Sequence, residues 1–199
     1  MNTPQFDDNY WNNRYRDETT GWDIGFVSPP IKDYINQLKD KNISILIPGC
    51  GNAYEAIYLL EKGFTNITLV DISPMLIDHL KRKFKQELGV SIHLICDDFF
   101  NIEGQFDLII EQTFFCALRP VLRDKYKSKM HQLLNDNGKL TGILFDRQFL
   151  NSPPFGGAKP EYTQLFAADF IIKTMEPCYN SIAPREGTEL FVILLKGKS

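Results

Sequence analysis

Cysteine, histidine and long apolar runs are all scarce in this sequence, and each scarcity excludes a class of protein. The 4 cysteines are widely spaced, with no C-x-x-C pair and no histidine at ligand spacing, so the sequence predicts neither a metal site nor a disulfide framework. The longest uncharged run, residues 42–54, contains a proline and two glycines and is much shorter than the ~20 apolar residues of a membrane-spanning helix. We therefore expect no metal, no disulfide and no membrane partner.

An excess of positive charge is also absent. The formal net charge is -3, so no overall basic field attracts nucleic acid, and no nucleic-acid partner is expected. The most basic stretch, residues 81–85, falls on a predicted helix and is interpreted as its solvated face. The start of the chain has no basic segment followed by an apolar one, which predicts no secretory signal and a cytoplasmic location.

The rest of the composition is that of an ordinary globular domain. The chain has 199 residues, of which 43% are hydrophobic and 24% charged, and this length predicts one domain over residues 1–199. Aromatic residues make up 13% of the chain. Both tryptophans, Trp11 and Trp22, precede every strand-like run, where core aromatics are not expected. Their position makes them candidates for a function outside the core.

From residue 43 onward, short apolar runs alternate with helical patterns, which is typical of an α/β fold. The first five runs are rich in Ile, Leu and Val with little polar alternation, as in strands buried on both faces of a parallel sheet. The predicted strands are residues 43–47, 67–70, 91–95, 106–110, 139–145, 170–175 and 190–195.

Three helices are predicted between these strands. Residues 54–62 end before Gly63, a residue type common just after helices. Ser73 is the predicted N-cap of a helix over residues 74–86, which begins with proline. Apolar spacing predicts the third helix over residues 119–134.

Two segments lie outside this alternation. Residues 1–40 are predicted to form an N-terminal helical cap of one or two helices, with a loop over residues 18–30. Residues 147–160 have no clear periodicity and contain the run Pro-Pro-Phe-Gly-Gly. A loop of this length in a compact domain is often a lid or a binding loop, and we interpret it in that way.

The first predicted strand ends in a glycine turn. Gly49 and Gly51 allow the backbone to approach a ligand with no Cβ in the way. Asp71 follows the second strand, where a carboxylate can accept hydrogen bonds from both hydroxyls of a ribose. The alternative is that Asp71 is only an acid before the helix capped by Ser73. Together the two features predict a nucleoside-binding unit.

The same turn discriminates between nucleoside cofactors. A dinucleotide-binding turn needs a small residue at the third position of G-x-G-x-x-G, and Tyr54 is bulky. Ala53 is the small residue instead, one position earlier. This spacing fits a degenerate E/D-x-G-x-G-x-G loop of class I S-adenosylmethionine-dependent methyltransferases, in which Ile47 replaces the acid and Ala53 the last glycine.

Several short motifs follow one another along the chain. They are Trp11-x3-Tyr15-x6-Trp22-Asp23-x-Gly25, Ile47-Pro48-Gly49-Cys50-Gly51, Val70-Asp71-Ile72-Ser73, Asp98-Phe99-Phe100, Phe106-Asp107-Leu108-Ile109, Phe114-Phe115-Cys116-Ala117, Leu133-Leu134 with Gly138-Lys139-Leu140, Pro153-Pro154-Phe155, and Pro184-Arg185-x-Gly187-x-Glu189. Any one motif is unspecific, but the set in this order resembles the thiopurine S-methyltransferase family, and more closely its thiol and halide methyltransferase branch. The resemblance covers nearly the whole chain.

The resemblance implies a Rossmann-like, mostly parallel sheet of seven strands in the order 3-2-1-4-5-7-6, with strand 7 antiparallel and helices on both faces. It implies S-adenosylmethionine as the cofactor. Trp11, Tyr15 and Trp22 would form an aromatic lid over its methionine end, because ring faces attract a sulfonium; the alternative is that they only pack the cap. Tyr15 departs from the tryptophan usual in the family. The other implied cofactor contacts are Gly49 and Gly51 at the turn, Asp71 on the ribose, Ile72, Asp98 on the adenine amino group, Phe99 through its amide, and Gln112.

Contacts to the methyl acceptor are expected from three residues: Phe155 as a wall of the pocket, Phe114, and Arg185. Arg185 could hold an anion or form an ion pair within its loop. Glu111 could contact the amine of the cofactor or cap the next helix. No histidine–acid pair indicates a general base, and no catalytic residue is predicted. This suits a thiol, whose pKa near ~8.5 leaves some thiolate at neutral pH, or a halide, which carries no proton.

The sequence thus predicts a methyltransferase that moves the methyl group of S-adenosylmethionine to a small molecule, first a thiol or thiopurine and second a halide. An oxygen, nitrogen or metalloid acceptor is the alternative within the same fold. A catalytically silent nucleoside-binding module is the alternative from another class, and a dinucleotide oxidoreductase is disfavoured by Tyr54.

Overall fold

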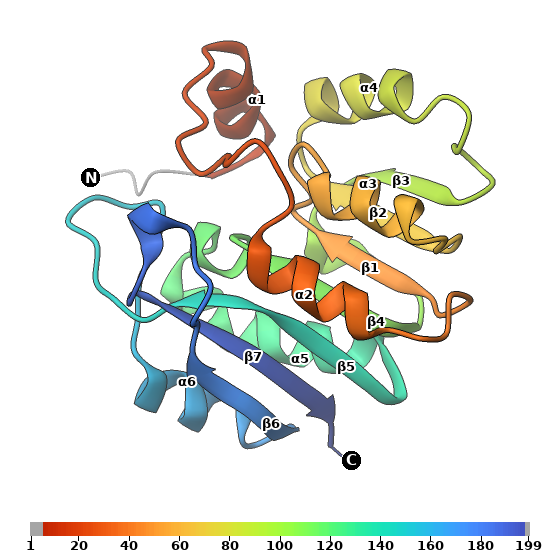
Figure 1. Cartoon of the computed structure of the whole chain (residues 1–199). Helices are drawn as coiled ribbons and strands as arrows, with labels where there is room; N and C mark the ends of the chain where they lie inside the picture. Colours follow the sequence, from red (N-terminus) through yellow and green to blue (C-terminus); the bar gives the residue numbers. More distant parts are fainter. Residues whose placement is uncertain (1–5, 198–199) are drawn as a thin grey trace.

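The computed structural model describes residues 6–197, in which one mixed sheet carries helices on both faces (Figure 1). The strand order is β3-β2-β1-β4-β5-β7-β6. Strands β1 to β5 pair in parallel, and β7 pairs antiparallel with β5 and with β6, which confirms the fold expected from the sequence. The strands are β1 (Ile45–Pro48), β2 (Ile67–Asp71), β3 (Ile92–Cys96), β4 (Phe106–Gln112), β5 (Leu134–Phe145), β6 (Phe170–Pro177) and β7 (Glu189–Lys196).

Alternate residues of the strands face two apolar cores, one on each side of the sheet. Ile45 and Ile47 of β1 pack with α2, α3 and α4 on one side, and Leu46 packs with α5 and α6 on the other. The chain therefore folds as three layers, helix–sheet–helix. The helices are α1 (Asp8–Arg16), α2 (Pro29–Gln37), α3 (Tyr54–Glu61), α4 (Pro74–Lys83), α5 (Arg123–Leu133) and α6 (Lys159–Phe166), with short 3-10 turns η1 (Phe99–Asn101), η2 (Phe115–Ala117), η3 (Pro120–Leu122) and η4 (Ala183–Arg185).

Helix α1 has no fully buried residue, and only Tyr15 among its side chains packs, partly buried, against a core. It lies beside α4 at the end of the sheet to which the β1 arrow points (Figure 1). Asn12 attaches it there, since its Oδ1 accepts hydrogen bonds from Ser73 Oγ at 2.6 Å and from Met75 N at 3.3 Å. Ser73 also caps α4 as predicted, by accepting from Leu76 N. Within the predicted N-terminal cap, α1 is thus held by these polar contacts and by Tyr15, whereas α2 is part of the core through Ile31 and Ile35.

Several element bounds differ from the predicted ones. Helix α4 ends at Lys83, earlier than predicted, because the backbone of its C-cap Phe84 leaves helical geometry at φ -101° and ψ 31°. Pro120 begins a 3-10 turn, so α5 starts later than predicted. Strand β5 starts earlier because Leu134 pairs with Phe106 across an irregularity in the register. Helix α6 begins at the end of the predicted 147–160 loop, with a proline in its first turn.

Candidate functional site

A cavity of about 850 Å³ opens at the carboxyl ends of β1, β2 and β4, with residues of α1 and of the loop after it forming one wall. This is the edge of a parallel α/β sheet where ligands usually bind. The cavity brings together twelve of the thirteen residues that the sequence predicted for the site. They are Trp11, Tyr15, Trp22, Gly49, Gly51, Asp71, Ile72, Asp98, Phe99, Gln112, Phe114 and Arg185.

Phe155 is the predicted site residue that does not line this cavity. Its ring packs against Phe6, with 5.7 Å between the centroids, and its N–H donates to Cys116 O at 2.6 Å. Pro153 and Pro154 of the same loop line the cavity instead. Since the backbone bond to η2 turns Phe155 toward the N-terminal segment, the loop reaches the cavity through its prolines.

The glycine turn leaves room for a ligand close to the backbone. Gly49 and Gly51 have φ values of +56° and +51°, in the left-handed region that favours glycine. A Cβ on Gly49 would overlap the Phe114 ring, and one on Gly51 would lie 3.5 Å from the Tyr15 hydroxyl. The turn, the lid and the end of β4 therefore meet at this point, and a side chain on Gly49 has no space.

Asp71 stands at the end of β2 with its carboxylate directed to the glycine turn. Oδ1 accepts from Ser73 N at 3.0 Å, and Oδ2 accepts from Gly51 N at 3.3 Å. Burial raises the pKa of Asp71 to about 6, against these hydrogen bonds, which lower it. A carboxylate has about four acceptor positions, so two remain for hydroxyl groups of a ligand.

The aspartate after β3 begins the 3-10 turn η1. Asp98 Oδ1 accepts from Phe100 N at 2.9 Å, which leaves Oδ2 for a ligand. The neighbouring Phe99 ring is buried against Phe114, with 5.2 Å between the centroids. This geometry is compatible with an adenine contact at Asp98 and the Phe99 amide, both of which stay predictions.

The three lid aromatics contact one another edge to face. The Trp22 ring lies 5.5 Å from that of Trp11 and 5.9 Å from that of Tyr15, with interplanar angles of 84° and 89°. Burial, and secondarily the negative charge of Asp71, raises the pKa of Tyr15 far above its usual range. The Tyr15 hydroxyl therefore stays protonated and can donate a hydrogen bond toward the turn.

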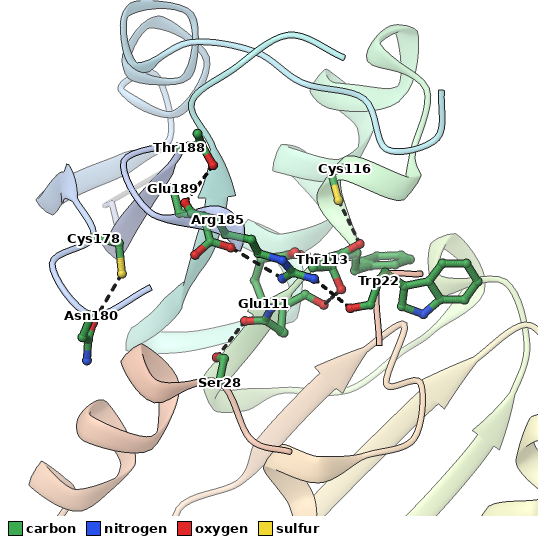
Figure 2. Close-up of polar contacts among 12 residues, drawn as sticks. Trp22, Ser28, Glu111, Thr113, Cys116, Cys178, Asn180, Arg185, Thr188 and Glu189 are labelled. Carbon is green, nitrogen blue, oxygen red and sulfur yellow. Dashed lines mark hydrogen bonds and ion pairs between the residues drawn. The ribbon is translucent and has the colours of Figure 1, made fainter. Parts of the chain in front are cut away.

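Two hydrogen bonds connect the segment between α1 and α2 to the far side of the cavity (Figure 2). Arg185 Nη2 donates to the carbonyl oxygen of Trp22 at 2.8 Å, and its Nη1 lies 3.5 Å from Glu189 Oε1. Ser28 Oγ donates to Gln112 Oε1 at 2.9 Å. The sequence left two roles open for Arg185, an anion contact and an ion pair within its loop. The ion pair, with Glu189, is present, and Arg185 also lines the cavity.

Glu111 is fully buried under the turn after β4. Its carboxylate accepts from Phe114 N at 2.9 Å and from Tyr126 Oη at 2.9 Å, and also from Phe115 N. Burial raises its pKa to about 7. These bonds hold Thr113, a β-branched residue at φ +62°, in a strained backbone conformation beside the cavity. The capping role is therefore the one observed for Glu111.

Sequence reasoning missed further lining residues: Arg14, Asp97, Phe145 and Phe149. The spacing of Arg14 three residues after Trp11 on one helix was a usable signal, because such residues share a face. Phe145 ends β5 at the same edge of the sheet as the glycine turn, but its orientation follows from packing.

None of the histidines lines the cavity. Across residues 6–197, no group of His, Cys, Asp and Glu could hold a metal ion, and no helix is long and apolar enough to cross a membrane.

The seven-stranded sheet with an antiparallel β7, the glycine turn after β1 and the acid at the end of β2 together define the Rossmann-like fold of class I methyltransferases. The family described as thiopurine S-methyltransferase matches residues 6–192, and the chain belongs to this family. It is therefore a methyltransferase that uses S-adenosylmethionine, and the free carboxylate positions of Asp71 and Asp98 fit the ribose and adenine of that cofactor.

Individual relatives agree with this family assignment, and a solved structure agrees with the fold. Probable thiol methyltransferase 2 of Arabidopsis thaliana is 27% identical over 184 residues, covering 90% of this chain and 81% of the relative. Thiopurine S-methyltransferase of Nitrosospira multiformis is 25% identical over 176 residues, covering 79% of this chain and 80% of the relative. The structure of Burkholderia thailandensis 1,6-didemethyltoxoflavin-N1-methyltransferase, with bound 1,6-didemethyltoxoflavin and S-adenosylhomocysteine, superimposes with a TM-score of 0.75 at 19% identity, covering 100% of this chain and 94% of the other.

Proposed function

We propose that this enzyme methylates the sulfur atom of a small thiol or thiopurine, with a halide ion as the second acceptor. The observation that carries the proposal is the composition of the cavity on the β4–β5 side. Phe114, Phe145 and Phe149 line it together with three prolines, and Arg119, Arg147 and Arg185 add positive charge. An apolar, positively charged pocket favours a soft, anionic nucleophile such as a thiolate over a neutral amine or alcohol. The names of the relatives, which include thiol, thiocyanate and thiopurine methyltransferases, support the same acceptor class.

The cofactor supplies an electrophilic methyl group on a sulfonium, so the protein needs to align the acceptor rather than activate it. In the proposed reaction, a thiol first loses its proton to water. The thiolate sulfur then bonds to the methyl carbon as the methyl–sulfonium bond breaks, and the electron pair of that bond stays on the sulfur of S-adenosylhomocysteine. Alignment of this kind is worth most when the reacting atoms are held about 3–3.5 Å apart.

In this proposal each predicted site residue keeps one role. Trp11, Tyr15 and Trp22 close over the methionine end, and the acceptor meets Phe114 and Arg185, while Phe155 fixes its loop from behind. The remaining cofactor contacts are Gly49, Gly51, Asp71, Ile72, Asp98, Phe99 and Gln112. The chain acts as one domain, and its four cysteines are free, which supports a reducing, cytoplasmic location.

Matched acceptors that differ in one atom test the acceptor class. Thiophenol, phenol and aniline have nearly the same shape, so their kcat/KM values compare sulfur, oxygen and nitrogen directly. We expect thiophenol to exceed the other two by at least about 100-fold, because at neutral pH it is largely a soft thiolate anion, whereas phenol keeps its proton and aniline is an uncharged amine. Faster methylation of phenol or aniline would reject the sulfur acceptor while leaving the methyltransferase assignment intact.

A further inference from the structure

Arg14 is a cationic residue of the lid that has no role in the proposed reaction. It lies on α1 between Trp11 and Tyr15 and lines the cavity with them. Its guanidinium carbon lies 5.5 Å from the centroid of the Trp22 ring. The positive charge is thus held at the lid aromatics, inside the cavity rather than on the outer surface of the helix.

The guanidinium of Arg14 has unused donors. Its Nε atom is shielded from solvent and has no hydrogen-bond partner. Within residues 6–197, no carboxylate lies within ion-pair distance of Arg14, whereas Arg16 on the same helix is exposed and pairs with Asp17 at 3.1 Å. A buried cationic N–H without an acceptor is costly, so its persistence points to an acceptor that a ligand brings.

The position of Arg14 indicates which anion this is. Two acids of the cavity fit the nucleoside: Asp71, at the end of β2, fits the ribose, and Asp98, after β3, fits the adenine. The nucleoside therefore has its own sites. The lid around Trp22 meets the glycine turn instead, because Asp23 accepts hydrogen bonds from Asn52 and Tyr54 just after that turn. The part of the cofactor farthest from adenine is its amino acid group, and the α-carboxylate is its one anionic group.

We propose that Arg14 binds the α-carboxylate of the methionine portion of the cofactor, with its Nε–H as one of the donors. The inference rests on the placement of S-adenosylmethionine in this cavity and adds a recognition element from the lid. Arginine suits the task because its guanidinium matches a carboxylate and can stay stacked on an aromatic ring at the same time. Cofactor binding would then satisfy the buried donor and bring α1 toward the glycine turn.

Binding of two cofactor fragments tests this assignment without turnover. S-adenosylhomocysteine carries the α-carboxylate, and 5′-methylthioadenosine has the same nucleoside without the amino acid group. In calorimetry, Arg14→Gln should raise the Kd of S-adenosylhomocysteine by about 10- to 100-fold, the range of a charge-assisted hydrogen bond. The Kd of 5′-methylthioadenosine should stay unchanged. Arg16→Gln, two residues along the same helix, is the matched control and should leave both values unchanged.

Each other outcome overturns the assignment. An unchanged Kd for S-adenosylhomocysteine would exclude the contact, and an equal loss for both ligands would make Arg14 a structural residue of the lid. A normal Kd with a raised KM for the methyl acceptor would assign Arg14 to the acceptor instead. Decarboxylated S-adenosylmethionine tests the idea on the unmodified enzyme, which should bind it at least about 10-fold more weakly than S-adenosylmethionine; equal affinity would contradict the proposal even if Arg14→Gln failed to fold.

Discussion

Arg185 donates a hydrogen bond to the carbonyl oxygen of Trp22 across 163 positions of sequence. This bond joins the 3-10 turn before β7 to the lid, so the last part of the chain fixes the first (Figure 2). Glu189, at the start of β7, lies within ion-pair distance of the same guanidinium and orients it. The lid is therefore held from two sides, by α4 through Asn12 and by the β6–β7 connection through Arg185.

The first prediction concerns this connection. Arg185→Met removes the donor to Trp22 while keeping an apolar side chain, and we expect a Kd for S-adenosylhomocysteine about five- to ten-fold higher, the effect of losing about 1 kcal/mol. The change in tryptophan fluorescence on ligand addition should shrink as well, since both tryptophans lie in the lid. Arg82→Met, on the exposed face of α4, is the control, and an equal effect there would refute a specific connection.

The second prediction follows from the pKa of Asp71. Burial raises that pKa to about 6, and the protonated acid can no longer accept from both ribose hydroxyls. The affinity for S-adenosylhomocysteine should therefore be constant above pH 7 and fall by up to about ten-fold per pH unit below pH 6. Asp71→Asn should bind weakly at all pH values, with the step near pH 6 removed. A step that persists in this variant would assign the titration to another group.

The third prediction concerns stability and Glu111. Its folded-state pKa is about 7, above the ordinary value of 4.5, so the folded protein holds this proton more tightly than the unfolded chain. The contribution of Glu111 to the free energy of unfolding is then largest at low pH and decreases as pH rises from 4.5 to 7. Relative to the unmodified protein, Glu111→Gln should gain up to about 1.4 kcal/mol per pH unit over that window. Urea unfolding of both proteins at several pH values measures the difference, and a pH-independent difference would contradict the raised pKa.

The fourth prediction separates backbone strain from lack of space at the glycine turn. Gly63→Ala places a side chain at φ +84° with nothing nearby and should cost about 1–2 kcal/mol of stability. Gly49→Ala has a comparable φ but also collides with the Phe114 ring, so its cost should be higher by about 1–3 kcal/mol. Only Gly49→Ala should also abolish cofactor binding, measured by calorimetry on the folded fraction. Equal effects of the two variants would show that the turn has free space.

Much of this molecule was predictable from local sequence. The apolar runs gave the strands, Ser73 gave the start of α4, and the glycine turn with Asp71 gave the binding edge, because these features depend on residues close in the chain. The antiparallel direction of β7 was implied only by the family resemblance, which rests on the order of the motifs. These are also the parts in which local preference and tertiary packing agree.

The remaining features depend on contacts between distant segments. The orientation of Phe155 is set by a backbone bond to Cys116, and the partners of Arg185 lie in the lid and in β7. The role of Glu111 is set by Tyr126 on α5 as well as by the turn beside it. No local pattern encodes such pairings, so the sequence left two roles open for Arg185 and for Glu111.

In the proposed reaction, the methyl group of S-adenosylmethionine reaches sulfur in this cavity. The direct measurement is a reaction of the enzyme with cofactor labelled with carbon-13 in that methyl group, in the presence of thiophenol, followed by nuclear magnetic resonance. We expect one labelled S-methyl thioether for each S-adenosylhomocysteine formed, and none with Asp71→Ala. S-adenosylhomocysteine formed without a labelled thioether, or no turnover of cofactor with any thiol, would contradict the proposed reaction.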